Sequence, residues 1–439
     1  MLTRACLGLS LLVALPAWSQ VAPAATGGTD IQDDAYRMPI LPMVSGQAFP
    51  ATTLSEERSN YLDARLAFEP AYYDNLLVGY GTHSISDMAY SIKPTIELDQ
   101  LTPRLHHTWT YNPSFTLYQH TAARNAEDQS ASLDLQYRLS QHTTISARDM
   151  FQQSSNVFNA ATSSLGETSS PAVVIPPLVG RLINTASAEI ANQFSRDDMI
   201  GAGGSIGLYN YPDKAQFPYL FDSNSRGGSA FYNRRLSGMQ YLGVTYQYGR
   251  VLGYPTSGEL EIQTHTVFLF YTGSLAHDLS LSLAAGPQYY DLVLSPLPAY
   301  ASWTPAVMAS IVRQGERTNF TANYSRTVTG GAGLLGAFSS NSANASARWQ
   351  TARTWTVAAT GTYMMFENES PQSVSTEPGR RSISGIASIE HSLGEHFTAR
   401  LEYQRLHENF NGLAGITSNP DSDREAISIT YQFTRPLGR

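Results

Sequence analysis

Residues 397–404 read FTARLEYQ, and this stretch decides the fold class. Its apolar letters F, A, L and Y alternate with the hydrophilic letters T, R, E and Q. Because successive side chains of a β-strand point to opposite faces, the alternation predicts a strand with one apolar and one hydrophilic face. The same alternation recurs in residues 108–117, 132–139, 279–283 and 427–433, so the chain is predicted to be all-β.

The length of these segments predicts what kind of sheet they build. A tilted strand needs about ten residues to cross the hydrocarbon layer, whereas strands of globular proteins average about five or six. An open sheet edge in lipid would leave backbone groups without hydrogen bonds, so the sheet must close. We therefore expect a transmembrane antiparallel up-and-down β-barrel.

The links between the predicted strands are short and long in turn, as in outer-membrane barrels with short periplasmic turns and long external loops. Counting strands between the links gives about 18, with 16 as the alternative and both termini on the periplasmic side. The weakest strands are residues 61–73, which contain Pro70, and 186–195. The short links are residues 101–104, 140–143, 195–198, 236–239, 275–278, 313–316, 350–353 and 393–396, and the long ones are 74–85, 121–128, 154–184, 211–227, 252–258, 291–301, 329–337, 367–379 and 409–423.

The N-terminal residues have the pattern of an export signal. One positive charge precedes the short apolar run 7–15, and Ala17-x-Ser19 fits a cleavage site, so residues 1–19 are predicted to be a signal peptide. The only cysteine, Cys6, lies within it.

Residues 20–57 are rich in Pro, Ala, Gly and Thr, which predicts a flexible periplasmic segment; the alternative is a plug folded into the barrel. The barrel is expected at residues 58–439.

The composition excludes other classes of protein. Only 15% of residues are charged, against about 25% in a typical soluble domain, and the 42 tyrosines and phenylalanines (25 and 17) suit a wall in contact with lipid. After the signal, no apolar run is long enough for a transmembrane helix. The net charge of -8 argues against a nucleic-acid partner.

No motif predicts a catalytic, metal or cofactor site, so an enzyme is not expected. The ten histidines are scattered without a metal-binding spacing. Asp421 and Asp423 resemble half of a calcium loop but lack its glycine and distal glutamate. The glycines at 330, 331 and 333 lack the Gly-Lys-Ser/Thr ending of a phosphate-binding loop and predict a flexible external loop.

Eight charged residues fall on the hydrophilic side of the predicted strands. Facing lipid near the midplane, such a charge would cost about 2–4 kcal/mol, so these side chains are expected to point inward. There they either form structural salt bridges or line an aqueous path, where their mixed signs predict weak ion selectivity. The candidate pore-lining residues are Lys93, Glu97, Asp134, Arg138, Arg348, Glu390, Arg400 and Glu402.

The longest link, residues 154–184, is the candidate constriction because a barrel of this size leaves a channel that needs narrowing. It is largely apolar, and the link 211–227 adds Phe217 and Phe221. Exposed apolar loops need a partner, so the two links are expected to pack together, to fold inward, or to meet another protein or an apolar ligand. The residues singled out in the longest link are Glu167, Val174, Ile175 and Arg181.

The terminal strand ISITYQF at residues 427–433, the paired long strands and Tyr324-Ser325-Arg326 before the 330–336 loop resemble bacterial porin-like outer-membrane β-barrel proteins, within them an uncharacterised group. One departure is that residues 434–439 follow Phe433, whereas such barrels end on the aromatic residue that the barrel-assembly machinery reads. The resemblance implies residence in the bacterial outer membrane, contact with its lipid and passive diffusion of small hydrophilic solutes, with a homo-oligomer left open. The alternatives are a non-conducting structural or adhesive protein that binds a partner through its apolar loops, and a hydrophobic-solute transporter.

Overall fold

The alternating residues form long β-strands throughout the described part of the chain. The computed structural model describes residue 38 and residues 60–76, 84–122, 125–155, 180–212, 220–255, 258–295, 298–330, 336–369, 380–409 and 421–437. Strand lengths run from 12 to 17 residues, enough for each to cross a bilayer at a tilt. The strands are β1 (Tyr61–Tyr73), β2 (Asp87–Leu101), β3 (Leu105–Tyr118), β4 (Ala126–Arg138), β5 (Thr143–Ser154), β6 (Arg181–Gln193), β7 (Asp198–Asn210), β8 (Ser223–Ser237), β9 (Gln240–Gly253), β10 (Leu260–Ala276), β11 (Leu279–Leu294), β12 (Tyr300–Gln314), β13 (Thr318–Gly330), β14 (Ala337–Ala352), β15 (Trp355–Asn368), β16 (Arg380–Leu393), β17 (Phe397–Asn409) and β18 (Asp421–Pro436).

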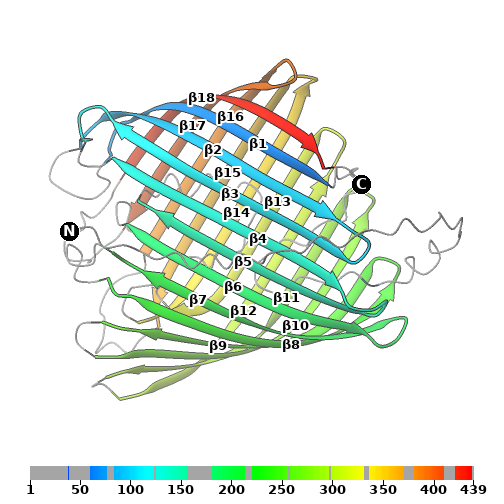
Figure 1. Cartoon of the computed structure of the whole chain (residues 1–439). Coiled ribbons are helices and arrows are strands. Elements are labelled where there is room, and N and C mark those ends of the chain that lie inside the picture. The colour runs from blue at the N-terminus through cyan, green and yellow to red at the C-terminus, as the bar shows by residue number, and fades with distance from the viewer. Residues whose placement is uncertain are drawn as a thin grey trace, which may run out of the picture. The chain divides into compact units, whose positions relative to one another are not determined.

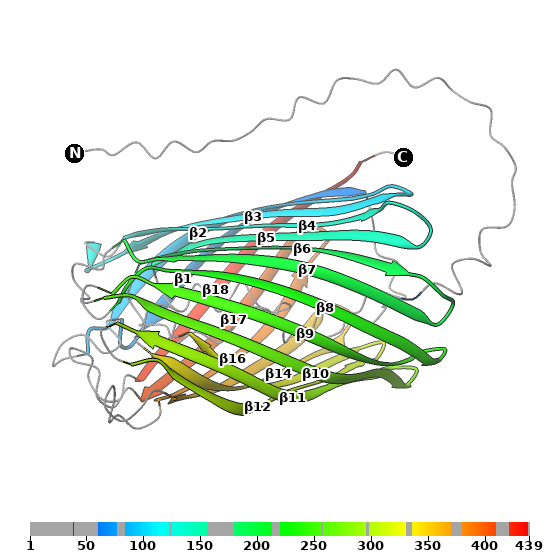
Figure 2. The ribbon, with the colours of Figure 1, turned by 90° about the horizontal axis from the view of Figure 1, so that it is seen from below.

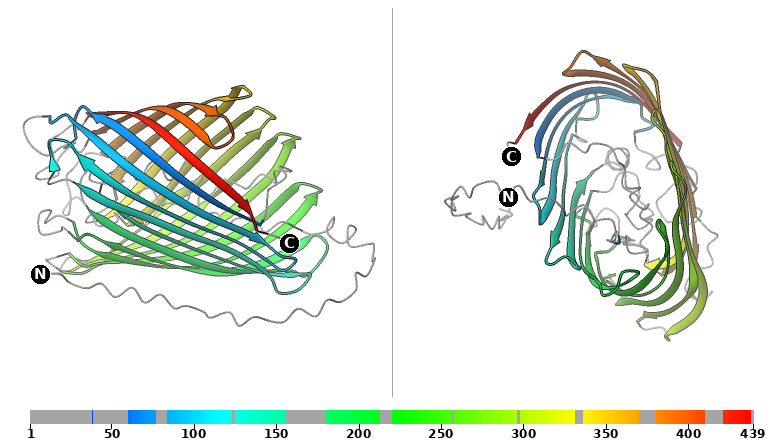
Figure 3. Two further views of the ribbon diagram at one scale, coloured as in Figure 1. Left: turned by 45° about the horizontal axis from the view of Figure 1, so that its top comes forward. Right: turned by 90° about the vertical axis from the view of Figure 1, so that its right-hand side faces the viewer.

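Neighbouring strands pair antiparallel all the way round, and the ring closes between the first strand and the last. Leu66 of β1 lies opposite Tyr431 of β18 in this closing pair, which Figure 1 shows as the blue and red strands side by side. The right-hand view of Figure 3 looks along the barrel and shows the strands following one another around it. Within the described residues the barrel has eighteen strands, so the predicted architecture is confirmed and the alternative count of 16 is wrong.

The links alternate as the sequence predicts. All eight short turns join an even-numbered strand to the next one, on the side where β1 begins and β18 ends (Figure 2). In the turn between β16 and β17, Gly394 has a φ of 83°, in the left-handed region that glycine adopts without steric cost. The strand ends that the nine long links join lie at the opposite end of the barrel.

Strand β1 accommodates Pro70 by losing pairing on one side only. Pro70 lies opposite Tyr90 of β2, whereas the ladder to β18 passes from Phe68 to Ala71 without a partner for the two residues between them. Because proline has no N–H to donate, it interrupts the ladder without ending the strand.

The outer face of the barrel is apolar. Leu401, Ile427 and Ile429, from the stretches that predict the fold, are each more than half exposed on the outside. At the end with the short turns, the ring of Trp355 stacks on His391 with centroids 4.2 Å apart, as in the aromatic girdle of a membrane barrel. The described residues include no helix long and apolar enough to cross a membrane.

The predicted segments outside the barrel fall largely on residues that the structure does not describe. Signal peptide 1–19 lies wholly outside the described residues, and within the predicted segment 20–57 only Met38 is described. The strands begin at Tyr61 and end at Pro436, inside the predicted barrel range 58–439.

Candidate solute pathway

The register of the sheet decides which residues face the interior. On β2, the exposed Ile92 and Ile96 alternate with Lys93 and Glu97, which therefore point inward. Applied strand by strand through the pairing, the same alternation places all eight candidate pore-lining residues on the inner face. Their role in lining a solute path stays a prediction.

Five of the eight belong to one continuous row of alternating charges, here called the ionic ladder. Because neighbours in the row come from adjacent or nearby strands, the row follows the inner wall around the barrel rather than along one strand. Four of its members are positive and three are negative. In order they are Lys93 (β2), Glu69 (β1), Arg424 (β18), Glu402 and Arg400 (β17), Glu390 (β16) and Arg348 (β14).

The ladder is tightest at its centre and looser towards Arg348. Lys93 Nζ lies 2.7 Å from Glu69 Oε1, and Arg424 Nη1 lies 2.8 Å from Glu402 Oε1. The gaps from Glu390 to Arg400 and to Arg348 are 3.6 Å and 3.7 Å. The side chain of Arg348 is 65% exposed, so this end of the ladder is accessible to solvent.

Arg424 holds the ladder together where the barrel closes. Its guanidinium is 1% exposed, contacts Glu69 through Nη2 and donates from Nε to the hydroxyl of Tyr73 at 3.1 Å. Together with Glu402, these partners satisfy a charge that would otherwise be very costly to bury. Sequence reasoning missed Arg424 because it traced the alternation of the last strand only over residues 427–433. Extending the alternation of residues 427–433 back by three positions would have put Arg424 on the inner face.

The other candidate pore-lining residues have local partners. Glu97 accepts a hydrogen bond from the hydroxyl of Tyr61 at 2.9 Å, and Asp134 pairs with Arg148 of the next strand at 2.6 Å. Arg138, at the end of β4, is exposed. The contacts of Glu97 and Asp134 fit the structural salt-bridge alternative.

The inner face across the barrel from the ladder carries two apolar clusters, which the sequence did not predict. Two clusters of buried residues lie on it, mostly on β6 to β12. The Met38 patch comprises Met38, Ala191, Met199, Phe231, Tyr241, Phe268, Phe270, Ala284 and Ala306. The Val328 patch comprises Phe221, Leu260, Ile262, Tyr290, Leu292, Leu294, Val328 and Ala337.

The Val328 patch forms where the end of β13 parts from β12. Pairing between β12 and β13 stops at Val307 and Arg326, whereas β13 and β14 stay paired as far as Gly330 and Ala337. Residues 327–330, which have no partner on β12, and residues 337–341, which stay paired with β15, are here called the inward hairpin. Val328 is 3% exposed and packs on inner-face residues of β10 and β11.

Two hydrogen bonds fix the inward hairpin to β11, the next strand beyond β12 in the wall. The backbone N–H of Val328 donates to Gln288 Oε1 at 2.7 Å, and Gln288 Nε2 donates to the Val328 carbonyl at 3.1 Å. A Cβ at Gly330 would lie 2.9 Å from Val251 Cγ1 of β9, so the hairpin approaches that strand closely too. The sequence predicts an external loop at 329–337, of which residues 331–335 lie outside the described residues. At its two ends, Val328 and Ala337 are buried in the Val328 patch.

The predicted constriction is only partly described. Glu167, Val174 and Ile175 lie outside the described residues, whereas Arg181 begins β6 on the inner face and is 4% exposed. Of the apolar residues in the link 211–227, Phe217 lies outside the described residues and Phe221 is buried in the Val328 patch. Phe221 thus takes the inward course that was one of the three alternatives for these loops.

The histidines do not form a metal site in the described part of the chain, where no group of three or more His, Cys, Asp or Glu side chains is placed to hold an ion. His106 lies 3.3 Å from Asp99 and His407 lies 3.2 Å from Asp421, each as a single pair.

Comparison with known proteins finds likeness in structure and not in sequence. No protein-family model and no curated protein matches the chain. The chain is a closed antiparallel β-barrel. Among solved structures it is similar to OccK2 (OpdF) of Pseudomonas aeruginosa, with a TM-score of 0.44 and 9% identity, covering 85% of this chain and 98% of that one.

Two other structures show the same distant likeness. OccAB4 of Acinetobacter baumannii has a TM-score of 0.40 and 10% identity, covering 85% of this chain and 98% of that one. The FrpB iron transporter of Neisseria meningitidis (F5-1 variant) has a TM-score of 0.43 and 9% identity, covering 82% of this chain and 65% of that one. The barrel that the sequence predicts is confirmed by the strand pairing of this chain itself.

Proposed function

We propose that the chain is a channel of the bacterial outer membrane through which small hydrophilic solutes diffuse passively. The observation that carries the proposal is the ionic ladder, a row of charges along the inner wall of a closed barrel with an apolar exterior. A barrel of this strand number has an interior wider than its own wall side chains fill. Charged groups on such an inner wall set the field that a permeating solute meets.

The surroundings of such a channel follow from its surfaces. The apolar outer face would contact outer-membrane lipid, and the strands would be inserted by the barrel-assembly machinery. Small solutes are the expected ligands, and passive diffusion requires no cofactor and no catalytic step. The proposal leaves open a homo-oligomer, in which copies of the barrel would contact one another through their outer faces.

The test is the conductance of the purified full-length protein in a planar lipid bilayer. Stable current steps with weak ion preference would support the channel, because the ladder carries charges of both signs. A folded barrel that inserts but never conducts would contradict it.

Replacing Arg348 with glutamate should shift the ion preference of the channel towards cations while leaving the barrel folded. Arg348 is the most exposed charge of the ladder, so its reversal changes the local field without breaking a buried pair. The measurement is the reversal potential in a salt gradient. Arg353→Glu, in the exposed turn of the same hairpin, is the matched control and should leave the potential unchanged. Equal shifts in both variants would show that only overall charge matters.

Deleting residues 158–177 should raise the single-channel conductance if the predicted link 154–184 narrows the path. The expected rise follows from removing the bulk of the longest link between strands that remain paired at both of its ends. Single-channel recording of the deletion variant checks this, and an unchanged conductance would reject the link as the constriction.

A hydrophobic-solute transporter is the second candidate, and the apolar inner face favours it. The Met38 and Val328 patches give this barrel an inner wall that a hydrocarbon solute could follow. Vesicles containing the protein separate the candidates: swelling in sugar solutions supports the hydrophilic channel, whereas uptake of an apolar fluorescent probe without swelling supports the transporter.

A further inference from the structure

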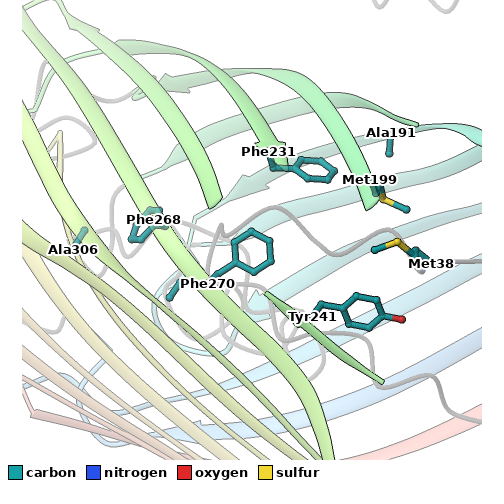
Figure 4. Packing of buried hydrophobic residues seen from close by; sticks show 9 residues of the cluster. Met38, Ala191, Met199, Phe231, Tyr241, Phe268, Phe270 and Ala306 are labelled. Atoms are coloured by element: carbon teal, nitrogen blue, oxygen red, sulfur yellow. The ribbon is translucent and has the colours of Figure 1, made fainter. Parts of the chain in front are cut away.

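A residue from before the barrel is buried on its inner wall. Met38 is 2% exposed and lies in the Met38 patch beside Met199 and Tyr241, with Phe231 and Phe270 on neighbouring strands (Figure 4). Every other member of the patch belongs to a strand of the wall. Met38 therefore binds to the wall of the barrel and is not one of its strand residues.

The backbone of Met38 is held as well as its side chain. Its N–H donates to Gln193 Oε1 at 3.0 Å, and Gln193 Nε2 donates to the Arg196 carbonyl at 3.0 Å. The second bond fixes which end of the Gln193 amide points at Met38. Gln193 pairs with Met199 across β6 and β7, so the polar contact and the apolar contact come from adjacent positions of the wall.

This arrangement has the chemistry of a peptide-binding site. A fixed amide oxygen accepts one backbone N–H, and the apolar surface beside it takes an unbranched, flexible side chain. Burying a methionine side chain favours the bound state by about tenfold or more, and the hydrogen bond adds about fivefold.

We propose that the Met38 patch is an internal docking site whose ligand is Met38 of this same chain. The chain before β1 is thereby tethered to the inner wall at this residue. The docking goes beyond the proposed channel function and does not depend on it, because it requires only the folded barrel.

Disulfide trapping tests the docking directly. Cys6 is the only cysteine of the sequence, so a Cys6→Ser chain offers no competing thiol. In this background, Met38→Cys with Met199→Cys should form an internal disulfide on mild oxidation, detected by mass spectrometry of its peptides. Met38→Cys with Thr95→Cys, on the inner face of β2, is the matched control. Yields that are equal in the two pairs would overturn the proposal.

Thiol labelling gives a second readout that needs no cross-link. A charged, membrane-impermeant thiol reagent should label Cys6→Ser/Met38→Cys slowly, and adding Gln193→Ala or Phe270→Ser should speed the labelling about fivefold or more. Gln263→Ala, on the outer face of β10, should not. Unchanged rates in both inner-face variants would contradict docking at this patch. The conductance of the same proteins tests the channel function separately. If no variant conducts, the channel proposal is contradicted, whereas the docking is decided by the disulfide yields alone.

Discussion

Replacing Arg424 with methionine should lower the free energy of unfolding of the barrel by about 3–5 kcal/mol, the cost of removing one partner from a buried ion pair. The variant leaves Glu69 and Glu402 buried, with only Lys93 and Arg400 to compensate them. Because these groups lie where the ring closes, the loss should be seen as a lower temperature at which the folded, fast-migrating form disappears on gel electrophoresis. Urea unfolding in lipid vesicles gives the free energy itself.

The matched control is Arg405→Met, on the outer rim of the neighbouring strand β17. Arg405 pairs with Asp421 at 3.2 Å but is 54% exposed, so its loss should cost at most about 1 kcal/mol. Neutralising both buried carboxylates in the triple variant Arg424→Met/Glu69→Gln/Glu402→Gln should recover much of the lost stability, because no uncompensated charge then remains. If Arg424→Met unfolds no more easily than Arg405→Met, the ladder does not stabilise the closure of the barrel.

Releasing the inward hairpin should produce the largest change in conductance. The double variant Gln288→Ala/Val328→Asp loses both hydrogen bonds between the side chain of Gln288 and the backbone of Val328. It also places a carboxylate among apolar residues. Each unsatisfied buried group costs about 1–3 kcal/mol, so the docked form should become rarer by at least about tenfold. Single-channel recording should then show a larger and more variable conductance than the unmodified protein.

The control for the hairpin is Gln263→Ala, which removes a glutamine from the outer face of β10 that bonds only to its neighbour Glu261. This variant should conduct like the unmodified protein. A conductance that stays the same in Gln288→Ala/Val328→Asp, with the barrel still folded, would show that the hairpin does not narrow the path.

The strands and the faces of this barrel were predictable because both depend on neighbouring residues. The alternation in residues 397–404 and 427–433 is a local property, and it assigned Arg400 and Glu402 to the inner face correctly. The short turns were equally predictable, since they fall where the alternation stops for a few residues. Even β1, interrupted by Pro70, kept its predicted limits because the strand pairs on its other side.

The contacts that build the candidate pathway depend on the closed ring, and no local pattern carries them. Arg424 and Glu69 are 355 residues apart in sequence and meet only because β18 closes on β1. Val328 and Met38 have side chains that suit many buried positions, and which wall receives them is decided by packing between distant segments. The sequence by itself thus determined the barrel and the orientation of its charges, because period and spacing are local properties, and it limited the strand number to about 18 or 16. Only the tertiary structure decided which charges pair and what folds inward, because those contacts exist only after the sheet has closed.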